Sequence, residues 1–124
     1  MILLTTEEII SIHSKLILKT GGLDGIRDKG LLESAIYSAN SSFDDVEQYK
    51  TIEEKSARLA YSIVNNHAFI DGNKRIGILV MLMMLKLNNI KISYTQDELI
   101  NLGLSIASGS SNYDDIYNRI NAHL

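Results

Sequence analysis

One segment of the chain, residues 67–77, gathers the residue types that transfer of a phosphate-containing group requires. It reads His-Ala-Phe-Ile-Asp-Gly-Asn-Lys-Arg-Ile-Gly. The His67 imidazole is a proton acceptor near neutral pH, and Asp71 is a hard oxygen ligand of the kind that Mg²⁺ prefers. Lys74 and Arg75 are adjacent cations. A phosphoryl- or nucleotidyl-transfer site combines such groups, so this segment is the candidate active site.

The two cations lie where a polar loop turns into an apolar run, Ile76–Leu85, which we predict to be a buried helix. A helix start offers free backbone N–H groups and the positive end of the helix dipole, which suits a phosphate. Lys74 and Arg75 oppose that dipole unless an anion is bound there. Gly72 would let the backbone approach the phosphate closely. Asn73 could cap the helix or bind the phosphates, and the two uses are compatible.

Each of these residues also has a purely structural interpretation. His67 would cap the last carbonyl groups of the preceding helix, Asp71 would belong to an Asp-Gly turn, and Lys74 would lie on a solvated helix face. The combination within one loop favours the functional interpretation. The other two histidines, His13 and His123, have no metal-ligand spacing to a partner and are predicted to lie at the surface.

Composition narrows the class of protein. A chain of 124 residues is long enough for one domain, and we expect residues 1–124 to form it. The net charge of −3 argues against a general nucleic-acid-binding protein. The absence of cysteine excludes disulfides and thiolate catalysis and fits a reducing cytoplasm. We find no signal peptide, and the longest apolar run would cover only about half of a bilayer, so we expect no membrane span.

The sequence predicts an all-α fold. It contains no proline, and three capping boxes precede apolar residues at helical spacing: Thr5-x-x-Glu8, Thr51-x-x-Glu54 and Thr95-x-x-Glu98. We predict six helices, at about residues 5–20, 31–39, 52–66, 73–87, 95–108 and 112–122. The fourth is apolar nearly all round, so the other helices should surround it. We interpret residues 40–50 as a loop or irregular turn.

The motif resembles the signature of the Fic/Doc superfamily, and specifically of the Doc, or death-on-curing, toxins. The resemblance rests on His-Ala-Phe-x-Asp-Gly-Asn-Lys-Arg at residues 67–75 and on Gly-Gly-Leu-x-Gly-Ile-Arg-Asp-x-Gly-Leu-Leu-Glu-x-Ala at residues 21–35. It covers nearly the whole chain and implies the compact six-helix Fic/Doc fold with a central buried helix. Phe69 matches the motif phenylalanine, which packs inward and fixes the loop.

The resemblance also implies a role for each motif residue. His67 matches the general base, and Asp71 matches the acidic metal ligand. Gly72, Asn73 and the backbone that follows match the anion-binding turn, and Arg75 matches the arginine that holds phosphates. The implied cofactors are ATP and Mg²⁺.

Lys74 distinguishes between two reactions that the resemblance allows. Most Fic enzymes carry glycine at this position and transfer AMP, whereas Doc proteins carry lysine and transfer the γ-phosphate of ATP to a hydroxyl of translation elongation factor Tu, which blocks translation. A lysine would fill the α-phosphate pocket, so ATP would bind in another orientation. Ile78 replaces a second arginine of the AMP-transferring enzymes, and Leu79 stands where a polar residue is expected.

The resemblance therefore implies a toxin kinase in which His67, Lys74 and Arg75 are catalytic. Two alternatives remain: a Fic-type adenylyltransferase, or a catalytically silent Fic-fold domain that only binds a partner. The chain lacks the internal inhibitory glutamate motif of many Fic proteins, so we expect a separate antitoxin. We expect a disordered antitoxin segment that folds as a helix into an apolar groove near the motif, with Phe43 and Tyr49 at its rim.

Overall fold

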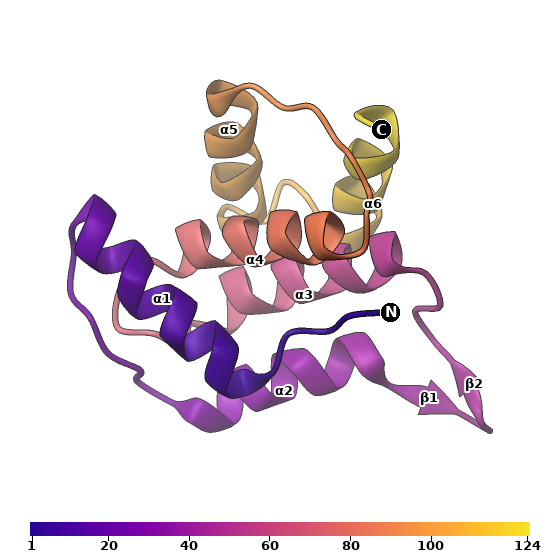
Figure 1. Cartoon of the computed structure of the whole chain (residues 1–124), viewed down its shortest axis with the longest axis horizontal. Coiled ribbons are helices and arrows are strands. Elements are labelled where there is room, and N and C mark those ends of the chain that lie inside the picture. The colour runs from indigo at the N-terminus through magenta and orange to yellow at the C-terminus, as the bar shows by residue number, and fades with distance from the viewer.

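Six helices and one short hairpin make up the computed structural model, which describes all residues from 1 to 124 (Figure 1). The predicted all-α fold is confirmed, and each predicted helix end lies within two residues of the observed one. The elements are α1 (Thr6–Thr20), α2 (Lys29–Asn40), β1 (Ser42–Phe43), β2 (Val46–Glu47), α3 (Ile52–Asn66), α4 (Asn73–Leu87), α5 (Gln96–Ala107) and α6 (Tyr113–Ala122).

Local capping explains why the helices begin where the sequence predicts. At α1 the Thr5 hydroxyl accepts a hydrogen bond from the Glu8 N–H, and the Glu8 carboxylate accepts one from the Thr5 N–H. The same reciprocal pair starts α3 and α5, so all three predicted capping boxes are confirmed. A fourth, between Asn112 and Asp115, starts α6. Each box satisfies backbone donors that would otherwise lack a partner.

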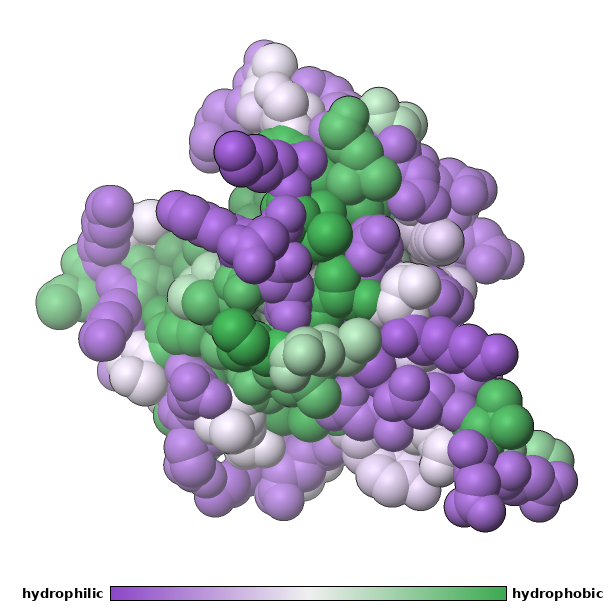
Figure 2. Space-filling model, turned by 45° about the vertical axis from the view of Figure 1, so that its right-hand side comes forward, coloured by the Kyte–Doolittle hydropathy of each residue, from purple (hydrophilic) through white to green (hydrophobic).

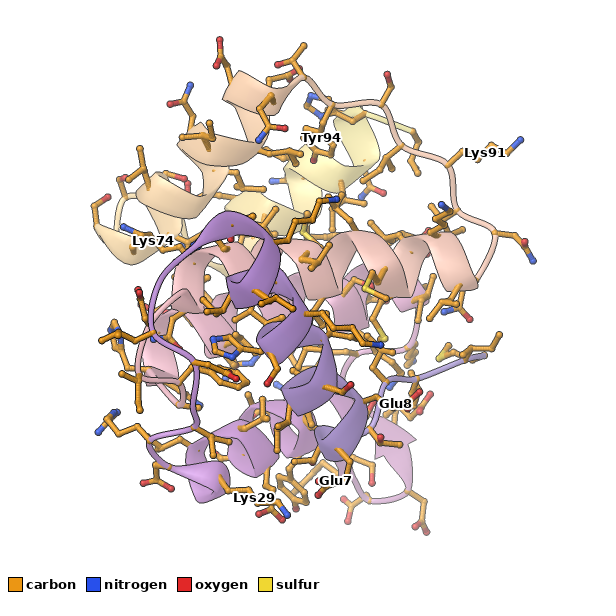
Figure 3. The ribbon with its side chains drawn as sticks, turned by 60° about the vertical axis from the view of Figure 1, so that its left-hand side comes forward. Glu7, Glu8, Lys29, Lys74, Lys91 and Tyr94 are labelled. Carbon is orange, nitrogen blue, oxygen red and sulfur yellow. The ribbon has the colours of Figure 1, made fainter.

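The central helix is α4, which lies along α3 and is crossed by α1 in the foreground of Figure 3. Gly77 permits the close approach of α3 and α4, because a Cβ atom there would lie 2.6 Å from Cγ2 of Val64. A single apolar cluster of 23 buried residues fills the interior. The prediction that other helices surround α4 is confirmed only in part, because Leu79 and Leu82 remain partly exposed.

Residues 40–50 contain a β-hairpin, so the prediction of a loop or irregular turn was wrong. Ser42 pairs with Glu47, and Phe43 pairs with Val46. The two turn residues are both aspartates at positive φ, 51° and 63°, as a tight two-residue hairpin turn requires. Aspartate adopts this conformation at some cost, and without glycine or asparagine the sequence carries only a weak hairpin signal.

A buried lysine anchors this hairpin to the helices. Lys55 on α3 is 1% exposed, and its ammonium group lies 3.3 Å from the Glu47 carboxylate and 3.4 Å from the Ala39 carbonyl oxygen. A buried ammonium group needs such partners. The end of α2, strand β2 and α3 are therefore joined at one point.

Apolar surface is unevenly distributed over the molecule. Figure 2 shows a broad apolar area in the middle of one face and a small separate patch at the lower right, where the hairpin projects. The hairpin exposes Phe43 (80%) and Val46 (54%).

The N-terminal segment is tied to the end of α4 by two hydrogen bonds between the backbone of Ile2 and the Asn88 side chain. No helix in the structure has the length and apolar character that crossing a bilayer requires.

His123 is only partly exposed, with 23% of its side chain accessible, so the prediction that it lies at the surface holds only in part. Its ring stacks on Tyr94 with centroids 3.9 Å apart, and its Nε2 lies 2.5 Å from the Glu98 carboxylate. Its Nδ1 lies 2.7 Å from the Arg119 carbonyl oxygen. These contacts join the start of α5 to the end of α6. The hydrogen bond with Glu98, and then that with Arg119, raise the pKa of His123 above its ordinary value.

This contact makes stability depend on pH. The pKa of His123 is raised in the folded state, so its protonated ring adds to the free energy of unfolding. This contribution is fully present below the ordinary pKa of 6.5 and is lost as the pH rises through the folded-state pKa. We expect His123→Gln to reduce the free energy of unfolding more at about pH 5.5 than at about pH 8.5. Urea unfolding of both chains at each pH measures this, and a difference that does not change with pH would contradict it.

Candidate active site

The motif loop is held by pairing with the loop between α1 and α2. The N–H groups of Arg27 and Asp28 donate to the Ala68 carbonyl oxygen at 2.7 and 3.0 Å, and the Ile70 N–H donates to the Gly25 carbonyl at 3.1 Å. Ile26 and Phe69 form an antiparallel bridge between them. The two segments that carry the family resemblance are therefore paired in space, and this loop pair supports the candidate site.

His67 occupies a strained position at the end of α3. It adopts the left-handed conformation, with φ 53° and ψ 46°, which is uncommon for a residue other than glycine. Its carbonyl oxygen accepts hydrogen bonds from Nε and Nη2 of Arg27 at 3.0 and 2.5 Å. The imidazole itself is exposed and makes no hydrogen bond within the chain, so it is accessible to a substrate. The sequence did not single out Arg27 as the residue that holds the His67 carbonyl group.

Asp71 is held as an ionised carboxylate. Its Oδ2 accepts the Leu23 N–H at 3.1 Å, and its Oδ1 accepts the Gly72 N–H at 2.8 Å. These two backbone hydrogen bonds, more than the nearby Arg75, lower the pKa of Asp71. The side chain is 43% exposed and keeps unused lone pairs. No three His, Asp or Glu side chains gather into a metal site, but one carboxylate suffices where Mg²⁺ shares its coordination with phosphate oxygens and water.

The guanidinium group of Arg75 has hydrogen-bond acceptors within the chain. Its Nη1 donates to the Thr20 hydroxyl and to the Gly21 carbonyl oxygen, both at 2.7 Å. These acceptors mark the end of α1, where the helix dipole is negative. The position of Arg75 at the helix start therefore has an explanation within the chain, beside the bound phosphate that the sequence favours. Lys74, by contrast, is exposed and forms no ion pair, and Figure 3 shows it at the start of α4 beside α5.

The turn between α3 and α4 is stabilised by hydrogen bonds within the turn. Gly72 precedes α4 with φ 78°, a conformation that suits glycine. The Asn73 side chain accepts the Phe69 N–H at 3.1 Å and donates to the Phe69 carbonyl at 3.0 Å. Asn73 therefore closes the loop, and the prediction that it caps the helix was wrong. One N–H of its amide group remains for a ligand. Phe69 is 2% exposed, which confirms its inward packing.

His13 lies beneath this turn and is buried, so its prediction as a surface residue was wrong. It is 1% exposed, and its Nε2 lies 2.7 Å from the Asp71 carbonyl oxygen. Its ring stacks on Phe69. It is the only polar residue among the buried residues of α1.

An apolar groove opens beside the cations, where Leu79 and Leu82 are left uncovered. Its volume is about 340 Å³, and it lies between α1, α4 and α5. We name it the α4–α5 groove, and its lining consists of Leu16, Thr20, Lys74, Arg75, Ile78, Leu79, Leu82, Gln96, Leu99, Ile100, Gly103 and Leu104. Phe43 and Tyr49 do not line it, so their prediction as rim residues was wrong. Phe43 belongs to the distant hairpin of Figure 1, and Tyr49 is buried against Tyr113.

Comparison with known proteins relates most of the chain to one family. A model of the Fic/DOC family matches residues 3–85, which include both members of the loop pair. The protein named Toxin Doc from Mycolicibacterium smegmatis is 30% identical over 98 residues, which cover 77% of this chain and 75% of that protein. The protein named Protein kinase doc from Escherichia phage P1 is 29% identical over 108 residues, which cover 86% of this chain and 82% of that protein.

A substitution at Gly22, which lies against the Asp71 carboxylate, tests the importance of the loop pair. Gly22 has φ 118°, and a Cβ atom there would lie 2.5 Å from Oδ2 of Asp71. We expect Gly22→Ala to lower the free energy of unfolding by about 1–3 kcal/mol and to shift the NMR signal of the Leu23 amide.

Gly21→Ala is the matched control, because Gly21 also has positive φ but nothing lies within 4 Å of its added Cβ atom. It should cost less stability and leave the Leu23 amide signal close to its original position. Equal effects of the two substitutions would show that the Gly22–Asp71 contact does not matter.

Proposed function

Because this chain belongs to the Fic/Doc family, we propose that it is a Doc-type toxin kinase, which transfers the γ-phosphate of ATP to a hydroxyl of a protein target. The observation that carries the proposal is the arrangement of the motif. The exposed imidazole of His67, the ionised carboxylate of Asp71 and the unpaired ammonium group of Lys74 surround one helix start. The names of the two relatives, a toxin and a protein kinase, support it.

The reaction assigns one task to each side chain. His67 accepts the proton of the target hydroxyl as its oxygen forms a bond to the γ-phosphorus. The bond between that phosphorus and the oxygen bridging to the β-phosphate breaks, and ADP leaves. Mg²⁺, when bound with Asp71, would neutralise charge on the phosphate oxygens. Lys74 and the N–H groups at the start of α4 stabilise the phosphates electrostatically.

Lys74 favours phosphoryl transfer over the alternative, AMP transfer. Its ammonium group adds a positive charge and bulk at the helix start, where a glycine would leave space for the α-phosphate. Ile78, which takes the place of a second phosphate-binding arginine, is 8% exposed and offers no donor. The target we propose is elongation factor Tu, in the cytoplasm. The exposed, unengaged imidazole and ammonium groups argue against a catalytically silent domain.

Labelled ATP tests this function directly. Incubation of the chain with purified elongation factor Tu should transfer label from the γ-position and none from the α-position. We expect His67→Ala to slow transfer by 10²–10⁴-fold and to keep the fold, because the imidazole is exposed and makes no hydrogen bond within the chain. His123→Gln is the control. This histidine lies outside the motif, where it joins α6 to α5, so its replacement should leave the transfer rate unchanged.

Each result has a distinct meaning. Label from the α-position would establish AMP transfer, and label from neither position would favour the silent domain. A His67→Ala chain that retains near-normal transfer would remove His67 from the mechanism.

The toxin proposal also requires an antitoxin, and the α4–α5 groove is its proposed binding site. The groove is mostly apolar along α4 and α5, and its lining includes the two cations Lys74 and Arg75. An amphipathic helix with an apolar stripe and an acidic side chain at one end would match both features. Such a helix would lie next to the phosphate-binding groups, so its binding would obstruct the site.

Substitutions in the groove should separate toxicity from neutralisation. Ile100 and Leu104 are 51% and 50% exposed in the groove, and we expect Ile100→Asp/Leu104→Asp to weaken antitoxin binding at least about tenfold. The control is Leu18→Asp, at a residue that is 89% exposed on α1 outside the groove. Growth is measured with each chain alone and with its antitoxin. Rescue of the groove variant to the wild-type level would exclude this binding site, and harmless expression of the wild-type chain alone would exclude a toxin.

A further inference from the structure

We propose that His13 is a positioning residue for Asp71, and that it sets the carboxylate that would bind Mg²⁺ together with ATP. The inference rests on the proposed function, because that function assigns the metal to Asp71. His13 lies on α1, 58 positions before Asp71 in the sequence. It belongs neither to the motif nor to the α1–α2 loop.

The hydrogen bond between the two residues has only one possible direction. The Asp71 carbonyl oxygen is an acceptor, so the Nε2 atom of His13, 2.7 Å away, must carry the proton. The ring is held in this orientation because it stacks on Phe69, with centroids 3.9 Å apart and planes 15° apart. Its Nδ1 lies 3.6 Å from the nearer oxygen of Asp24. The donor is therefore fixed in place by packing.

The peptide group between Asp71 and Gly72 transmits this constraint to the carboxylate. Its carbonyl oxygen accepts from His13, and its N–H, which belongs to Gly72, donates to Oδ1 of the Asp71 side chain at 2.8 Å. A peptide group is planar and rigid, so orienting its carbonyl also orients its N–H. His13 therefore controls the direction of one of the two backbone hydrogen bonds that hold the Asp71 carboxylate.

Burial indicates that the hydrogen bond is the reason for a histidine at this position. The ring is 1% exposed, and its neighbours on the buried stripe of α1 are Ile9 and Ile17. An apolar side chain would fill such a space without the cost of burying a polar group. Replacement of a residue that orients a metal ligand by a hydrogen bond typically lowers metal affinity 10–100-fold.

Two substitutions separate the hydrogen bond from the packing. His13→Phe keeps an aromatic ring against Phe69 but removes the donor, whereas His13→Gln supplies an amide N–H that can reach the same carbonyl. Ile9→Val, at a fully buried position of the same helix, is the control for a general loss of α1 packing. Calorimetry measures the affinity of each chain for ATP with Mg²⁺ and with chelator alone.

We expect His13→Phe to weaken ATP binding about tenfold or more in the presence of Mg²⁺ and to leave binding in chelator unchanged. His13→Gln should recover most of the loss, and Ile9→Val should lower stability without altering the dependence on Mg²⁺. Equal Mg²⁺ dependence in the wild-type and His13→Phe chains, or no recovery by His13→Gln, would overturn the inference.

A measurement on the unmodified chain guards against variants that fail to fold. Long-range proton–nitrogen NMR should show a proton on Nε2 of His13, and an unprotonated Nε2 would overturn the inference. None of these measurements uses the transfer reaction. A chain that binds ATP with Mg²⁺ as expected but transfers no label would therefore refute the proposed function and leave the role of His13 standing.

Discussion

The pairing of the α1–α2 loop with the motif loop is the interaction on which the site depends. Three backbone hydrogen bonds join residues 25–28 to residues 68–70, and side chains add contacts at both ends. Arg27 fixes the carbonyl of His67 at one end, while Leu23 fixes the carboxylate of Asp71 at the other. Since α3 ends and α4 begins within this short loop, the pairing sets the position of His67 relative to Asp71.

The same pairing determines which charges are available to a ligand. Asp71 and Arg75 are both engaged with the segment from Thr20 to Leu23. The Asp71 carboxylate also lies 3.6 Å from Nη2 of Arg75 and partly offsets the guanidinium charge, whereas Lys74 forms no ion pair. The uncompensated positive charge at the helix start therefore lies more on Lys74 than on Arg75, although the sequence presents them as an equal pair.

This arrangement also connects the groove to the site. Thr20 and Arg75 line the α4–α5 groove and are hydrogen-bonded to each other. A helix that enters the groove would contact the end of α1, whose next residues hold Asp71. A bound partner would consequently affect both Arg75 and Asp71, even without contacting His67.

The sequence predicts the parts of this structure that depend on local interactions. Capping boxes act over three residues, so the starts of α1, α3 and α5 were predictable, as was the helix that follows the motif. Features that depend on contacts between distant segments were not. The partner of His13 is 58 positions away, and the burial of Lys55 depends on a hairpin whose turn lacks the usual glycine.

The motif residues therefore fall into two groups that their order in the sequence does not distinguish. Asn73 uses its side chain to close the loop, and Phe69 and Arg75 use theirs to join it to α1. His67 and Lys74 have side chains that are exposed and without partners, although the backbone of His67 is tightly held. Asp71 combines both uses, because its carboxylate accepts two backbone hydrogen bonds and keeps lone pairs for a ligand. At His67 the two uses fall on different groups, because the strained backbone carbonyl supports the loop while the imidazole ring stays exposed.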